Sequence, residues 1–320
     1  MRKTKGPTLK NPAISICLTL LTTALATPCM FAQEPDLGNL LTTSPRVVFL
    51  GDSITYSGGY VARLDAWLEM QNLDQKPELL NLGLPSETVS GLSEEGHAGG
   101  RFPRPDLAER LARVLQKTEP DLIIACYGIN CGIYQDFDEQ RFQKYQQGIQ
   151  NLVTRAKACD AQLILLTPPT FDDQRSRRDF SYDAVMTQYA EWLVKQGHKN
   201  GWRVIDLHTP MLKELESIRQ QTPPGTMQPD AVHPNARGHQ VLAEILIEQF
   251  QQEVPEEILA PPTGLLSLVQ QRQDVLRDAW LKHTGHTRPG LRQGSSLEEA
   301  AKKADVLSQQ ITDSLPQKSP

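Results

Sequence analysis

Four short segments, far apart in the chain, carry the residue types that acyl transfer needs. Ser53 follows the apolar run RVVFL, Gly83 ends ELLNLG, Asn130 lies in YGIN, and DAVHP carries Asp230 and His233. A serine hydroxyl is a weak nucleophile until a histidine accepts its proton, and an acidic side chain must hold that histidine and stabilise its cation. N–H donors must also stabilise the oxyanion of the tetrahedral intermediate. Together, these residues predict a serine hydrolase.

The segments that precede these residues must bring them together. Five short apolar runs alternate with helical patterns along the chain, which is typical of a parallel sheet with helices on both faces. In such sheets, sites form at the carboxyl ends of the strands. We expect strands at residues 46–50, 78–83, 121–128, 162–169 and 202–207, and helices at residues 60–70, 106–116, 142–158, 182–197 and 235–250.

The pattern changes after this last helix. A stretch rich in proline and acidic residues follows, and then two further helices are expected, at roughly 265–283 and 296–312. We therefore predict an α/β domain at residues 45–252, followed at 253–320 by a linker and a short helical C-terminal extension.

The four segments, in this order, resemble the motifs of the SGNH hydrolases, also called the GDSL esterases and lipases. GDSI carries Ser53, NLG carries Gly83, GIN carries Asn130, and DAVHP resembles the family block with Asp230 and His233. The resemblance covers about residues 45–252. With the strand pattern, it implies a three-layer α/β/α sandwich around a five-stranded parallel sheet of flavodoxin-like order.

The resemblance also implies a role for each residue. Ser53 attacks the ester carbonyl, His233 accepts the serine proton, and Asp230 orients His233. The N–H groups of Ser53 and Gly83 and the side chain of Asn130 hold the oxyanion. No cofactor or metal is implied.

The substrate class is an expectation from the family. Secreted members often remove acetyl groups from sugars, so the resemblance implies an O-acetyl ester on a carbohydrate, small or polymeric. A lipase or lysophospholipase is an alternative, but it would need a greasier lid than the polar inserts at residues 84–105 and 170–181. A non-catalytic carbohydrate-binding module on the same fold is a third alternative.

Two positions depart from the family pattern, and each motif alone has a simpler explanation. Cys131 follows Asn130 where the family usually has aspartate, and Ser86 stands where a second glycine is frequent. Taken singly, Ser53 would more often belong to a helix N-cap, and Asn130 to a turn. It is their joint placement at successive strand ends that favours a catalytic site.

The N-terminus reads as a secretory signal at residues 1–32. Four basic residues precede the uncharged run 13–26, which is short for a membrane span, and cleavage is expected after Ala26 or Ala32. A retained anchor and a lipid on Cys29 are the alternatives. We therefore expect a secreted or periplasmic protein without stable membrane insertion after cleavage.

Charge and cysteine content exclude other classes. Beyond residue 32 there remain 29 basic and 38 acidic side chains, a formal charge of −9, so nucleic acid is not expected as a partner. The three cysteines beyond the leader, Cys126, Cys131 and Cys159, are too few and uneven for a disulfide framework. Nothing in the sequence predicts the oligomeric state.

Several other residues near the expected site have simpler explanations than chemistry. We expect His97, Arg101 and Arg104 in a solvated loop, and His239 to be structural. An arginine cluster follows the fourth strand and is expected to be solvated, with substrate contact as the alternative: Arg175, Arg177 and Arg178. His283 and His286 lack a third metal ligand nearby, so we expect the extension that carries them to pack on the domain.

Overall fold

A five-stranded, entirely parallel sheet forms the centre of this computed structural model, which describes Met1 and residues 37–71, 73–250, 261–262 and 264–315. The strand order is β2-β1-β3-β4-β5, the flavodoxin-like order. The strands are β1 (Arg46–Gly51), β2 (Glu78–Asn81), β3 (Leu122–Cys126), β4 (Gln162–Leu166) and β5 (Arg203–Ile205). The expected fold class is therefore confirmed, and every strand begins within one residue of its predicted start.

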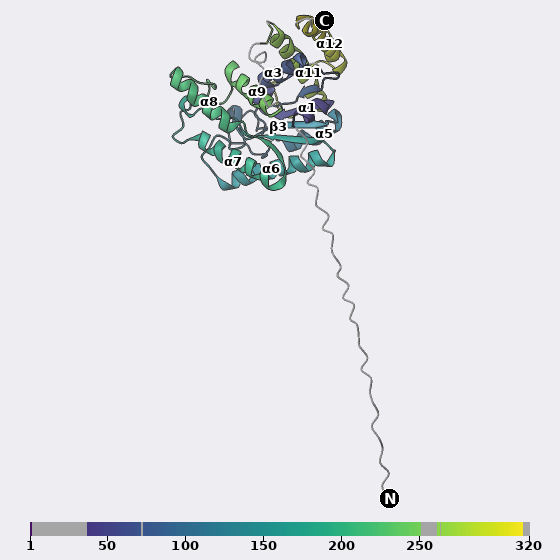
Figure 1. Ribbon diagram of the computed structural model, residues 1–320. Helices are drawn as coiled ribbons and strands as arrows, with labels where there is room; N and C mark the ends of the chain where they lie inside the picture. The colour runs from purple at the N-terminus through teal and green to yellow at the C-terminus, as the bar shows by residue number, and fades with distance from the viewer. Residues whose placement is uncertain (2–36, 72, 251–260, 263, 316–320) are drawn as a thin grey trace. The chain divides into compact units, whose positions relative to one another are not determined.

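Helices cover both faces of this sheet (Figure 1). From β1 to β2 the chain moves toward one edge of the sheet, and in the later connections it moves toward the other edge. Because connections between parallel strands are right-handed, the helix between β1 and β2 lies on one face of the sheet and the helices of the later connections lie on the other. One face carries α1 (Leu37–Thr43), α3 (Gly59–Met70) and α9 (Ala236–Phe250), and the other carries α5 (Leu107–Thr118), α6 (Glu139–Ala158) and α7 (Tyr182–Asn200).

Burial on both faces explains why the strands are continuous apolar runs. All five residues of β3 are buried, and in β1 only Arg46 is not. Such a strand has no polar face, so its sequence shows no alternation. This is also why the polar residues that end each run stand out in the sequence.

Among the described residues, two helices of seven residues or more were not predicted. The helix α1 has seven residues, and α8 (His208–Gln221) packs against α9. In α8 only His208, Met211 and Leu215 are buried, so its apolar stripe is too narrow to give a clear helical period.

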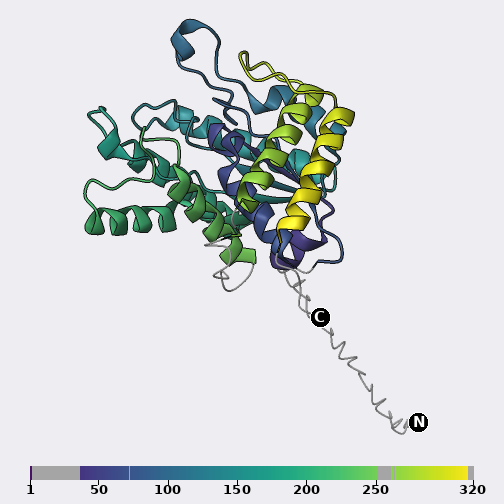
Figure 2. The same cartoon turned by 90° about the horizontal axis from the view of Figure 1, so that it is seen from above.

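The described part of the C-terminal extension contains α11 (Leu265–Thr284) and α12 (Leu297–Ser314), which lie side by side (Figure 2). The helix α11 contacts α3 and the edge strand β2, so it covers a sheet edge that would otherwise be open to pairing. Arg272 of α11 forms ion pairs with Asp65 at 2.9 Å and with Glu69 at 2.7 Å, both on α3.

The predicted leader at residues 1–32 and most of the predicted linker lie outside the described residues. The expected boundaries at 45–252 and 253–320 therefore stay a prediction. No helix within the described ranges has the length and apolar character needed to cross a membrane.

Candidate active site

Ser53 is the first residue of a short helix, α2 (Ser53–Ser57), which begins directly after β1. The N-cap of this helix is Asp52, whose Oδ1 accepts the N–H of Ile54 at 2.9 Å. Asp52 is buried, and burial raises the pKa of its carboxyl to about 6. The N-cap is therefore Asp52 and not Ser53, so capping does not occupy the Ser53 hydroxyl.

The Ser53 hydroxyl instead faces a histidine. Its Oγ lies 2.8 Å from Nε2 of His233, and Nδ1 of the same ring lies 2.6 Å from Oδ2 of Asp230. An aspartate at Nδ1 holds the ring proton there, so Nε2 is presented to Ser53 as an acceptor. The structure thus connects three residues from opposite ends of the domain in one chain of hydrogen bonds.

The segment around Asp230 holds this carboxylate in place. Its Oδ1 accepts the backbone N–H groups of Val232 at 3.0 Å and of His233 at 2.7 Å. Partial burial would raise the pKa of Asp230, but these bonds and the His233 ring lower it overall. Asn235 precedes α9, and its Oδ1 accepts the N–H of Gly238 at 3.0 Å, as expected of an N-cap.

The Asn130 side chain is buried, and its contacts determine which way the amide faces. Its Oδ1 accepts hydrogen bonds from Nη1 of Arg104 and from the hydroxyl of Tyr134, both at 2.9 Å. Its Nδ2 donates to the carbonyl of Glu87 at 3.3 Å. Two donors therefore occupy the oxygen, and an amide nitrogen has two hydrogens, so one hydrogen remains for a further acceptor.

Arg104 does not lie in a solvated loop, so that expectation is wrong for this residue. It is 8% exposed, and its Nε and Nη2 bind the two carboxylate oxygens of Glu94 at 2.6 and 2.7 Å. Partial burial would raise the pKa of Glu94, but Arg104 lowers it to about 2. The insert at residues 84–105 therefore contacts the site through the hydrogen bond from Arg104 to Asn130.

Gly83 lies at the end of β2, in close contact with α2. A Cβ on Gly83 would lie 2.3 Å from the backbone N of Tyr56, so only glycine fits there. Its N–H donates to Oδ1 of Asn81 at 3.0 Å, and Asn81 in turn donates to the carbonyl of Thr55 at 2.7 Å. Gly83 therefore has a packing role, and an oxyanion would have to compete with Asn81 for its N–H.

The backbone N–H of Ser86 is a candidate oxyanion donor that the sequence did not identify. It has a φ of 70°, in the left-handed region that favours glycine, which explains why glycine is frequent at this position. The N–H groups of Ser86 and Ser53 donate no hydrogen bond to any of the described residues. The signal in the sequence was that serine stands where the family frequently has glycine, because a glycine that recurs at one position indicates an unusual backbone conformation there.

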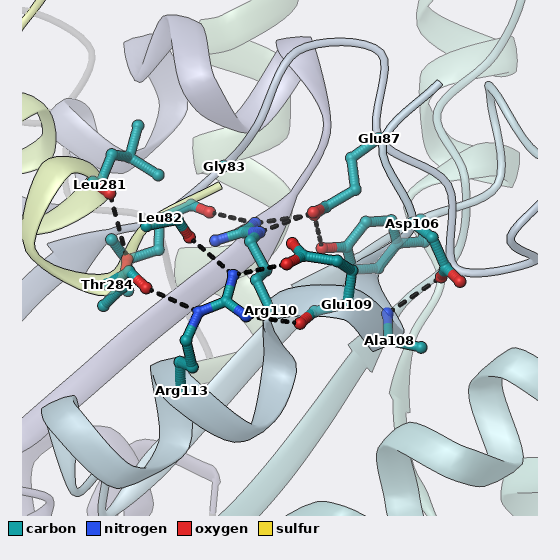
Figure 3. A network of polar contacts seen from close by, with 12 residues as sticks. Leu82, Gly83, Glu87, Asp106, Ala108, Glu109, Arg110, Arg113, Leu281 and Thr284 are labelled. Atoms are coloured by element: carbon teal, nitrogen blue, oxygen red, sulfur yellow. Dashed lines mark hydrogen bonds and ion pairs between the residues drawn. The ribbon is translucent and has the colours of Figure 1, made fainter. Parts of the chain in front are cut away.

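A buried ion pair supports the loop at residues 82–87, which contains Gly83 (Figure 3). Arg110 of α5 donates from Nε and Nη2 to the two oxygens of Glu87 at 2.6 and 2.7 Å, and Nη2 also donates to the carbonyl of Leu82 at 2.7 Å. The Tyr127 hydroxyl donates to Glu87 at 2.6 Å. Leu82 and Glu87 lie on either side of Gly83 and Ser86, so the pair holds both ends of this loop.

Cys131 is fully buried, where the family usually has aspartate. Burial raises the pKa of its thiol to about 11, so it is neutral and takes no anionic role. The hydrogen bonds that orient Asn130 come instead from Arg104 and Tyr134. Cys126 is also buried and Cys159 is exposed, and these three cysteines are free thiols.

Three of the other histidines contact neighbouring side chains. The expectation that His97 is solvated is wrong. Its ring packs edge-on against Phe102, with the ring centres 5.4 Å apart, and its Nδ1 lies 3.2 Å from Oε1 of Glu94. His239 is buried against Ser57, at 3.1 Å, which agrees with a structural role. His283 packs on Trp280 at 5.7 Å. Within the part of the chain that the structure describes, no three histidine, cysteine or acidic side chains gather to hold a metal ion.

The fold and this site together define an esterase-type serine hydrolase. Residues 49–241 match the model of the GDSL-like Lipase/Acylhydrolase family, so the chain belongs to that family, whose members are acylhydrolases. The resemblance of its motifs to those of the SGNH hydrolases is thereby confirmed. No curated protein matches the chain significantly.

Solved structures with the same fold include three of particular interest. An acetylxylan esterase from Geobacillus stearothermophilus is 22% identical with a TM-score of 0.52, over 67% of this chain and 97% of that one. An alpha/beta hydrolase enzyme from the metagenome of Lake Arreo, Spain, is 25% identical with a TM-score of 0.51, over 65% and 95%. A gut microbial diltiazem-metabolizing enzyme is 21% identical with a TM-score of 0.50, over 64% of this chain but only 46% of its own.

Proposed function

We propose that this chain is an exported carbohydrate O-acetylesterase with Ser53 as its nucleophile. The observation that carries the hydrolytic role is the chain of hydrogen bonds from Ser53 through His233 to Asp230. Two further facts support the sugar ester. The acetylxylan esterase noted above is similar over nearly its whole length, and neither insert, at residues 84–105 or 170–181, contains a long apolar run.

In the first half of the reaction, Nε2 of His233 takes the proton of the Ser53 hydroxyl as Oγ attacks the acetyl carbonyl carbon. Asp230 stabilises the imidazolium that forms. His233 then gives the proton to the departing sugar oxygen, which leaves an acetyl-serine. In the second half, a water molecule repeats the same steps, with His233 again as base, and releases acetate.

The oxyanion of each tetrahedral intermediate is held by N–H donors. The Ser53 N–H and the remaining Nδ2 hydrogen of Asn130 are two of them. Gly83 is the third donor that the family resemblance implies, whereas the lack of a competing acceptor favours Ser86. No step requires a cofactor or a metal.

Export is proposed on the leader alone. The basic residues and apolar run of residues 1–32 have the pattern of a secretory signal, which would deliver the enzyme to the periplasm or the exterior. Extracellular polysaccharide is accessible there, which fits the proposed substrate.

A fluorophosphonate probe tests the nucleophile, because it labels only an activated serine. We expect labelling of the wild-type chain at Ser53 and none after Ser53→Ala. Labelling that persists in the variant, or its absence in the wild type, would contradict the assignment and favour a non-catalytic module.

A panel of p-nitrophenyl esters of increasing acyl length, alongside acetylated xylan, tests the substrate. We expect the acetyl ester to have the highest kcat/KM, and xylan to release acetate. A preference for long acyl chains would instead indicate a lipase or lysophospholipase.

A further inference from the structure

Arg178 lies in the loop after β4, and its position is held by specific contacts. Its guanidinium lies 5.2 Å from the ring centre of Tyr134 and 5.5 Å from that of Phe171. Its Nε donates to the carbonyl of Tyr134 at 3.1 Å, and its Nη1 to Ser176 at 3.2 Å. A long exposed side chain normally has many rotamers, but these contacts select one.

Tyr134 places this guanidinium beside the catalytic centre. The Tyr134 hydroxyl donates to Oδ1 of Asn130 at 2.9 Å, and the Asn130 amide is a proposed oxyanion donor. Arg178 is therefore one aromatic ring away from the oxyanion donor, on the side that carries the 170–181 insert.

Within the described part of the chain, no carboxylate pairs with the charge of Arg178. Arg104, on the same Tyr134 ring at 5.3 Å, is neutralised by the two-pronged ion pair with Glu94. Arg178, by contrast, forms no ion pair with any carboxylate among the described residues, and its Nη2 makes no hydrogen bond with them. An ordered guanidinium with a free edge can bind a carboxylate in a planar, two-pronged geometry.

We propose that Arg178, held on Tyr134, recognises a carboxylate on the alcohol part of the ester, as on a uronic acid next to the acetylated hydroxyl. This inference rests on the proposed function and narrows it to acidic carbohydrates. The acyl group is not the partner, because an acetyl group has no charge. Arg178 thus sets specificity, and the acetyl chemistry itself remains with Ser53 and His233.

The same loop offers a matched control. Arg177 is the neighbouring residue with the same charge and is exposed, and it makes no hydrogen bond, ion pair or ring contact with the described residues. Arg177→Ala therefore changes the net charge and the local field as Arg178→Ala does, but leaves the ordered guanidinium in place. Arg178→Lys keeps the charge and removes the planar fork.

The experiment compares kcat/KM for an anionic and a neutral acetate ester in the wild type and each variant. The pairs are acetylated methyl galacturonoside against acetylated methyl galactoside, and 4-acetoxybenzoate against 4-acetoxybenzamide. Because each ratio is compared between variants, the intrinsic reactivity of the two esters cancels. The neutral ester also reports any general loss from misfolding or a displaced Asn130.

We expect Arg178→Ala to lower the anionic-to-neutral ratio about tenfold or more, as for a lost hydrogen bond to a charged group. Arg178→Lys should recover only part of it, and Arg177→Ala should change it less than about twofold, as a solvated charge does. An unchanged ratio in Arg178→Ala, or an equal fall in Arg177→Ala, would overturn the proposal.

The two substrate pairs separate this inference from the proposed function. If the wild type cleaves aryl acetates but no sugar acetate, the carbohydrate assignment is wrong, while the benzoate and benzamide esters still measure the effect of Arg178. If sugar acetates are cleaved without any preference for the uronate, the proposed function stands and the Arg178 inference fails.

Discussion

Asp52 carries an electrostatic cost that a single substitution should remove. The side chain is 3% exposed, and burial raises its pKa from 3.8 to about 6, against the opposing effects of the Ile54 N–H and His233. At about 1.36 kcal/mol for each pKa unit, the cost of keeping this carboxylate ionised in the folded protein is about 3 kcal/mol. Asp52→Asn keeps an oxygen that can accept the N–H of Ile54 but cannot ionise.

The sign of the effect depends on pH. Well below pH 3.8 the Asp52 carboxyl is protonated in the folded and unfolded states, and the cost is absent. As the pH rises to about 6, the unfolded chain loses this proton first, so the wild type loses stability relative to Asp52→Asn. Above about pH 6 the full difference is present.

Urea unfolding followed by circular dichroism measures this difference. The free energy of unfolding of Asp52→Asn, minus that of the wild type, should rise by about 2 kcal/mol between about pH 4.5 and about pH 7.5. Asp106→Asn is the control, because Asp106 caps α5 with the same 2.9 Å bond to a backbone N–H but is less buried. A difference that is equal at both pH values, or that falls with pH, would refute the burial argument.

Three further outcomes are expected. Asn130→Ala should lower kcat by about 10²–10³ with little change in KM, since an oxyanion donor acts in the transition state, and steady-state kinetics on p-nitrophenyl acetate checks it. Glu87→Gln should destabilise the fold by about 3–5 kcal/mol, because it leaves the charge of Arg110 buried without its partner. In a double-mutant cycle measured by urea unfolding, Glu87→Gln combined with Arg110→Met should destabilise the fold by less than the sum of the two single substitutions. Burial lowers the pKa of His239 from 6.5 to about 4, so the unfolded chain binds its proton first and the wild type should lose stability as the pH falls through this range. His239→Gln should flatten that loss in thermal unfolding at different pH values, and an unchanged acid limb would contradict it.

The strands and the residues that end them were predictable for a local reason. A strand covered on both faces must be apolar throughout, so the first polar residue or glycine after it marks the carboxyl end of the strand. Ser53, Gly83 and Asn130 were selected in this way. The histidine and aspartate were selected by their spacing in DAVHP, and the structure brings His233 to Ser53 across 180 residues of sequence.

Local patterns failed where a contact depends on how the loops fold after the strands end. Arg104 belongs to a polar insert and looked solvated, but it is buried because Glu94 and Asn130 both bind it. Gly83 was selected for its N–H, yet Asn81, two residues earlier in the chain, occupies that group once the strand ends and the loop turns. Neither contact has a periodicity or a motif that would mark it in the sequence.

The sequence by itself therefore determined the class of fold and the family, and it predicted the reacting side chains, because these depend on residue types and their order along strands. The tertiary structure alone decided how the site is held. It shows that two donors orient the Asn130 amide and that Arg110 and Glu87 brace the loop beside it. It also shows that Arg178 is ordered on an aromatic ring, with no ion-pair partner among the residues that the structure describes. These features arise from hydrogen bonds and burial between segments that meet only when the chain has folded, so no stretch of sequence contains them.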